Sequence, residues 1–178
     1  MEEKVIYVYE NWSDVTPILI GKLYASSIKG KEQFSFEYDI SWLSSESANY
    51  FLDPDLALYN GRHYAPMDKT LFGIFADSCP DRWGRLLMKR REAIKARKED
   101  RKPKKLGECD YLLGVYDEAR MGALRFSLQE KGAFLSDDKE LATPPWTTLR
   151  TLEAASLGFE KDESGLEEKW FYIFGKKI

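Results

Sequence analysis

Apolar and polar residues alternate, or form short β-branched runs, in the first forty residues of the chain. The runs at 5–9 (VIYVY) and 18–24 (ILIGKLY) are typical of strands, and residues 33–38 (QFSFEY) alternate as in a half-buried strand. A turn around Gly30 precedes the third run and suits a hairpin. Short polar connections favour an antiparallel arrangement, because parallel strands need long crossovers.

The pattern changes to helical spacing in the middle of the chain. After the apolar stretch at 71–76, the sequence DRWGRLLMKRREAIKARK predicts a helix that opens at Pro80 or Asp81. Proline is tolerated in a first helical turn, and an acid there complements the helix dipole. An apolar stripe at helical spacing lies beside a basic one, and it consists of Trp83, Leu86, Leu87 and Ile94. Residues 98–105 (KEDRKPKK) lack apolar side chains and should form a solvated linker.

Shorter signals complete the expected order of elements. A short helix can begin within 41–50, and loops follow it as far as a tight turn at Asn60-Gly61. Beyond the linker we expect a helix at 108–115, a strand at 123–128 and two helices at 147–157 and 166–173.

Together these elements predict an α+β fold. It would have a small antiparallel sheet or partly closed barrel at the N-terminus, helices packed on it, and a helical C-terminal part. We divide the chain into a strand-rich subdomain at 1–97 that ends in the DRWGR helix, a basic linker at 98–105, and a second subdomain at 106–178.

Charge is spread unevenly along the chain. Residues 82–105 hold twelve Lys or Arg against three acids, a local net charge of +9, whereas the remaining residues hold fifteen bases against twenty-seven acids, or −12. The 14% aromatic content predicts a folded chain, because disordered chains lack such apolar surface. The acidic N-terminus and the lack of a long apolar run predict a cytoplasmic protein without a membrane span.

Recognisable catalytic chemistry is missing from the sequence. Cys79 and Cys109 have no paired spacing that would indicate zinc, and His63 lies in a turn-like NGRHY context without a nucleophile pattern, as a surface or loop histidine would. No phosphate-binding glycine motif follows a strand. We therefore predict a protein that is not an enzyme and that uses neither a cofactor nor a metal.

The segment DSCPDRWGRLLMKRRE concentrates side chains that often dominate partner interfaces, Trp and Arg above all. The candidate partner interface consists of Asp77, Asp81, Arg82, Trp83, Arg85 and Arg120. A purely structural role is the alternative for each. Trp83 would then pack in the core, Gly84 would allow close helix approach, and Asp77 would cap the helix or pair with Arg85. The arginines of the DEARMGALRF segment would form ordinary salt bridges with Asp117 or Glu118.

Two strings, LFGIFADSCPDRWGRLLMKRRE and ECDYLLGVYDEARMGALRF, resemble the N-terminal region of HipA-type toxin kinases of bacterial toxin-antitoxin systems. FSFEYDISWL and LDPDLALYNGRHY precede them at the expected order and distance, so the resemblance covers about residues 5–126. In this family the N-terminal part packs on a C-terminal kinase domain that binds ATP and magnesium. The resemblance implies that the kinase domain is absent from this sequence, which ends YIFGKKI, so no catalytic residue is carried over.

Three hypotheses for function follow. The first is a non-catalytic regulatory module that docks on and modulates a separately encoded kinase-type toxin subunit, with a DNA-binding antitoxin of the same locus as a further partner. The second is a truncated fragment of such a kinase, consistent with the aromatic ending EKWFYIF. The third is a nucleic-acid-binding module that uses residues 82–105. We expect no direct nucleic-acid binding, because that segment lacks interleaved aromatics and the rest of the chain is acidic.

Overall fold

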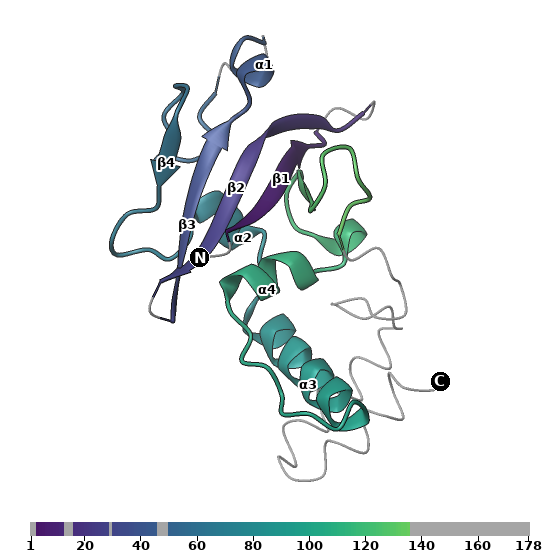
Figure 1. Cartoon of the computed structure of the whole chain (residues 1–178). Helices are drawn as coiled ribbons and strands as arrows, with labels where there is room; N and C mark the ends of the chain where they lie inside the picture. Colours follow the sequence, from purple (N-terminus) through teal and green to yellow (C-terminus); the bar gives the residue numbers. More distant parts are fainter. Residues whose placement is uncertain (1–2, 13–15, 29, 46–49, 136–178) are drawn as a thin grey trace.

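An open antiparallel sheet of five strands forms the centre of the molecule (Figure 1). The computed structural model describes residues 3–12, 16–28, 30–45 and 50–135. The strands are β1 (Lys4–Glu10), β2 (Ile18–Ile28), β3 (Lys31–Tyr38), β4 (Arg62–Tyr64) and β5 (Leu124–Ser127). Their order across the sheet is β4-β3-β2-β1-β5, so β4 and β5 are the edges. The predicted antiparallel sheet is thus confirmed in its open form. The helices expected at 147–157 and 166–173 lie outside the described residues.

The first three strands form a meander, as the alternating pattern predicted. The β2–β3 hairpin closes where Ile28 pairs with Lys31, and Gly30 takes the positive φ of 78° that such a turn requires. Gly21 lies where β2 and β3 come closest, because a Cβ there would collide with the Glu37 carbonyl oxygen. Only glycine fits this position without a backbone shift.

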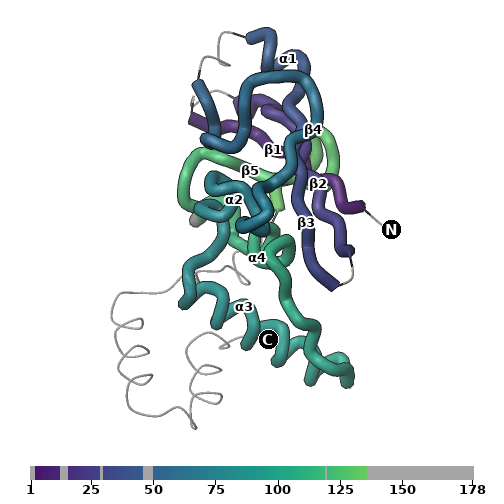
Figure 2. Tube along the Cα trace, turned by 90° about the vertical axis from the view of Figure 1, so that its left-hand side faces the viewer, coloured from purple at the N-terminus to yellow at the C-terminus, as the bar shows by residue number. Residues whose placement is uncertain are grey.

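Five helical segments complete the described chain. They are α1 (Ile40–Leu43), α2 (Gly73–Asp77), α3 (Arg82–Lys98), α4 (Glu108–Gly114) and the 3₁₀ turn η2 (Asp117–Ala119). Figures 1 and 2 show α2 against one side of the sheet, with α4 and then α3 beyond the ends of the strands. Within the residues that the structure describes, no helix has both the length and the apolar content needed to span a bilayer.

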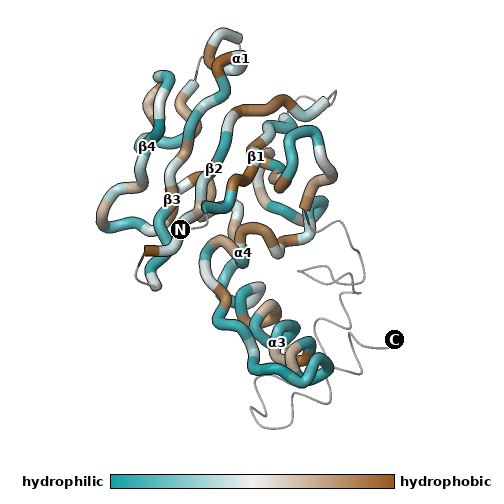
Figure 3. Tube along the Cα trace, in the orientation of Figure 1, coloured by the Kyte–Doolittle hydropathy of each residue, from teal (hydrophilic) through white to brown (hydrophobic). Residues whose placement is uncertain are grey.

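Aromatic side chains from the sheet and from α2 dominate the core. Phe75 of α2 is fully buried, and its ring centroid lies 5.3 Å from that of Phe36 and 6.3 Å from that of Phe126. Aliphatic residues surround them, including Ile6, Val8, Ile20, Leu23 and Leu112. Figure 3 shows this apolar character along β1, β2 and α4, whereas α3 and the segment after it are mainly hydrophilic.

The predicted boundary at 98–105 does not divide this core. β5, from the segment assigned to a second subdomain, pairs antiparallel with β1, with Tyr7 opposite Ser127. Cys109 and Leu112 of α4 belong to the same cluster of buried residues as the first three strands. As far as residue 135, the chain therefore builds one core around one sheet, and the remainder of the 106–178 segment lies outside the described residues.

Three described elements were absent from the sequence-based expectation, namely β4, α2 and the 3₁₀ turn η2. Strand β4 lies where loops were expected, and its three residues extend the sheet beside β3. Helix α2 has only five residues, too few for a helical period to show. The expected surface or loop position of His63 is also wrong, because His63 lies in β4 and is only 4% exposed. Its ring centroid lies 4.1 Å from that of Tyr59 and 5.5 Å from that of Tyr38.

Candidate functional site

The candidate interface begins where α2 ends and α3 starts. Asp81 is the N-cap of α3, and its side chain accepts a hydrogen bond from the Gly84 N–H at 2.7 Å. Gly84 is buried, and a Cβ there would lie 2.7 Å from the Cβ of Pro80. The predicted start of this helix is confirmed, and Gly84 permits a close approach to the preceding proline.

Arg85 joins α3 to α4 and does not pair with Asp77. Its guanidinium donates to both carboxylate oxygens of Glu108, at 2.6 and 2.8 Å, and to the Pro80 carbonyl at 3.1 Å. The same group lies 4.6 Å from the ring centroid of Tyr111, and its hydrogen bonds to Glu108 raise the pKa of Arg85. The suggested role for Asp77 as helix cap or ion-pair partner is therefore wrong, because Asp81 caps the helix and Glu108 holds the arginine.

Arg82 and Trp83 lie on the first turn of α3, at the surface end of this junction. Arg82 is exposed, and Trp83 is half-buried. Asp77, at the end of α2, is also exposed. All three side chains thus have solvent-accessible surface, and their role as a partner interface stays a prediction.

Arg120 is buried and serves the fold. Its guanidinium donates to the carbonyls of Ser78, Leu112 and Val115 at 3.0, 2.8 and 3.2 Å, which ties the end of α4 to the segment after α2. Burial lowers the pKa of Arg120 to about 10, and the nearby carboxylate of Asp117 opposes that shift. With 8% of its surface exposed, Arg120 cannot contact a partner directly, so this member of the candidate interface is misplaced.

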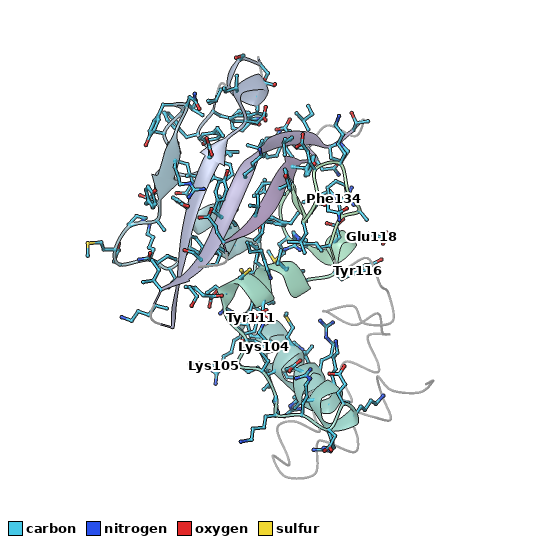
Figure 4. The ribbon with its side chains drawn as sticks, viewed as in Figure 1. Lys104, Lys105, Tyr111, Tyr116, Glu118 and Phe134 are labelled. Atoms are coloured by element: carbon cyan, nitrogen blue, oxygen red, sulfur yellow. The ribbon has the colours of Figure 1, made fainter. Side chains whose placement is uncertain are left out.

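The salt bridge expected for the DEARMGALRF segment is made by Arg125. Its Nε donates to Oδ2 of the buried Asp117 at 2.7 Å, and its guanidinium lies 3.8 Å from the ring centroid of Phe134. Tyr116 and Glu118 line the adjoining pocket (Figure 4), whose volume is about 230 Å³. Ligand pockets are usually about 300 Å³ or larger, so we assign this one no small molecule.

Exposed apolar side chains gather at the end of the sheet next to α1, and sequence reasoning missed them. We call this surface the aromatic patch; it consists of Trp12, Ile18, Ile40, Tyr50 and Phe51, which are 39–66% exposed. The rings of Trp12 and Tyr50 lie 5.3 Å apart. The Tyr50 hydroxyl donates to the buried carboxylate of Glu10 at 3.0 Å, and burial with this contact raises the pKa of Tyr50. The sequence signal that could have revealed this patch is the presence of aromatic residues inside polar loop segments.

The segment expected to be a solvated linker is exposed, but it is held against α3. Glu92 accepts hydrogen bonds from Arg101 Nη1 at 2.6 Å and from the Lys104 backbone N–H at 2.8 Å. The Lys104 ammonium also donates to Asp110 at 2.7 Å. These contacts lower the pKa of Glu92 to about 2, and the hydrogen bond from Arg101 has the largest effect.

The two cysteines of the chain, Cys79 and Cys109, are free thiols. Burial raises the pKa of Cys79 to about 12 and that of Cys109 to about 11, so both thiols stay protonated at neutral pH. Among the described residues, no group of three or more His, Cys, Asp or Glu side chains is arranged to hold a metal ion.

Comparisons of the chain with protein-family models, with curated proteins and with solved structures found no match. The likeness to HipA-type N-terminal regions therefore stays a prediction that rests on the quoted motifs.

Proposed function

We propose that this chain is a non-catalytic docking module that binds and modulates a separately encoded kinase-type subunit. The family resemblance suggests the partner, and the surface of the molecule supplies the physical argument for docking. The aromatic patch is the observation that carries the proposal.

Exposed clusters of large apolar side chains are typical of interaction sites. Two aromatic residues of the patch, Trp12 and Phe51, expose 43% and 66% of their surface, although the core beside them buries Trp42 almost completely. Covering such side chains removes apolar area from water and stabilises a complex by about 25 cal/mol per Å² before the costs of association. The exposed Arg82 and the adjacent Trp83 form the second surface proposed for the partner.

The experiment measures binding of the full chain to the purified kinase-type protein encoded by a neighbouring reading frame, by isothermal titration calorimetry. We expect Trp12→Ala and Phe51→Ala to weaken binding at least about tenfold. Trp83→Ala should cost about 2 kcal/mol or more, roughly a thirtyfold loss of affinity. Tyr64→Ala is the matched control, because Tyr64 is 71% exposed and lies outside both surfaces.

Different results would overturn different parts of the proposal. If Arg82→Ala and Trp83→Ala leave the affinity unchanged, the surface at the start of α3 is not the interface. If the aromatic-patch variants also bind normally, or if no complex forms, the docking function is wrong. The alternative of a truncated kinase fragment predicts that kinase-coding sequence continues directly downstream in the same locus.

A further inference from the structure

The basic segment at 82–105 folds back on itself and forms one surface. Figure 1 shows the chain turning at the end of α3 and running back along the helix to α4. Asp100 makes this turn with a positive φ of 49°. Lys104 and Lys105 lie between α3 and α4 (Figure 4), and contacts with Glu92 and Asp110 hold Lys104 there. Positive charges of the return segment therefore lie beside those of the helix.

Two of the three acids of this region, Glu92 and Glu99, are occupied by internal contacts. Arg101 pairs with Glu92 and Glu99, at 2.6 Å in each case, and Lys95 lies 3.9 Å from Glu99. The two acids that follow in the chain behave alike, since Glu108 holds Arg85 and Asp110 holds Lys104. These four acids are thus engaged by internal ion pairs.

Four exposed cations remain without an ion-pair or hydrogen-bond partner among the described residues. We call them the basic surface: Arg82, Lys89, Lys102 and Lys105. Arg82 and Lys89 are seven residues apart, which places them on the same face of α3 about 10 Å apart along its axis. Because the side chain of Glu92 binds the backbone of Lys104, the return segment lies beside the helix. The four cations consequently lie along one ridge, formed by α3 and the return segment.

The sequence alone favoured no direct nucleic-acid binding, but the folded chain brings exposed cations together. We propose that the basic surface binds the phosphate backbone of nucleic acid without reading its sequence. Fixed ammonium and guanidinium groups attract phosphates and release their counterions, and this term alone supports sequence-independent binding. The rest of the chain carries a net charge of −12 and repels a polyanion, so binding is confined to this ridge. Arg82 belongs to both this surface and the proposed kinase-docking surface, so the test leaves Arg82 and the aromatic patch unchanged.

The test uses the full chain and a fluorescein-labelled duplex DNA of about 20 base pairs with random sequence, followed by anisotropy at several salt concentrations. Four phosphate contacts predict that the logarithm of the binding constant falls with the logarithm of salt with a slope of about −3 to −4. The variant Lys89→Gln/Lys102→Gln/Lys105→Gln should bind at least about tenfold more weakly and should have a slope smaller by about 2 to 3.

The matched control is Lys22→Gln/Lys69→Gln/Lys131→Gln, which changes the net charge equally on the sheet and its loops. It should keep both the affinity and the salt slope, and circular dichroism should show that both variants are folded. Equal losses in the two variants would overturn the proposal, because net charge alone would then explain binding. Tighter binding of a polyglutamate peptide than of the DNA would overturn it as well, and would indicate an acidic protein partner.

Discussion

The sheet and helix α3 are held in place by different forces. In the sheet, fully buried rings such as Phe36 and Phe75 contact one another across strands and helix. Helix α3 has a mainly hydrophilic surface and buries only a short apolar stripe, Leu87, Met88 and Ala96, while charged hydrogen bonds from Arg85 and Glu92 tie it to α4 and to the segment after it. Burial of apolar area contributes most of the folding free energy, whereas exposed ion pairs contribute little.

The junction between the two regions is itself polar. Glu32 of β3 accepts hydrogen bonds from the backbone N–H groups of Glu108 and Cys109, at 2.5 and 3.4 Å, and so caps the start of α4. Glu108 in turn holds Arg85 of α3. The difference teaches that the sheet depends on a large aromatic core, whereas the position of α3 depends on a small apolar contact and a short chain of charged hydrogen bonds.

The largest expected effect belongs to the core. Phe75→Ala removes a fully buried ring from contact with three other phenylalanines, and should lower the free energy of unfolding by about 3–5 kcal/mol. Urea denaturation followed by tryptophan fluorescence measures the change. Tyr64→Ala is the control and should stay close to the parent. A loss below about 1 kcal/mol for Phe75→Ala would contradict the assignment of stability to this cluster.

A smaller loss is expected for the buried arginine. Arg120→Met keeps much of the side-chain volume but leaves three buried carbonyls without their donor, and should destabilise the chain by about 2–4 kcal/mol. The same denaturation assay applies, with Arg82→Ala as a surface control expected to have little effect. Binding of the folded Arg120→Met protein to a partner should be unchanged; a selective loss of binding at normal stability would restore Arg120 to the interface.

The smallest global effect is expected in α3, from Glu92→Gln. The midpoint of thermal unfolding should barely move, but the return segment should loosen, because Glu92 holds both Arg101 and Lys104. The pKa of Glu92 is lowered in the folded chain, so the contact stabilises the folded chain at pH values above the ordinary glutamate pKa. This stabilisation is lost as the pH falls toward 2. The amide resonance of Lys104 should therefore titrate near pH 2, and Glu92→Gln should abolish that titration. A midpoint near pH 4.5 would show that the contact is not formed.

Local signals in the sequence predicted the elements that are long or strongly patterned. Two β-branched runs and one alternating run identified the meander, and the Pro80-Asp81 pair located the start of α3 within one residue. Partnership between distant segments was not predictable in the same way. Nothing in residues 124–127 indicates that they pair with β1, and only this pairing shows that the chain to residue 135 forms one core.

Only part of the candidate site was predictable from the sequence, for a similar reason. The sequence alone does not distinguish an arginine whose guanidinium is exposed, such as Arg82, from one that binds buried carbonyls, such as Arg120. The partners of Arg120 include Ser78, forty-two residues away, so no local pattern could reveal them. The aromatic patch likewise forms only when Trp12 and Tyr50, from two separate loops, come together.

The pairing of β1 with β5 has a consequence for synthesis of the chain on the ribosome. The first strand leaves the exit tunnel at once, yet the strand that completes its edge, residues 124–127, follows more than a hundred residues later. Until then, the nascent sheet presents the backbone donors and acceptors of Tyr7 to Glu10 as an open edge, which is a template for unwanted pairing with other chains. Completion of the fold is therefore a late event in translation, and a factor that shields nascent strands has a long interval in which to act.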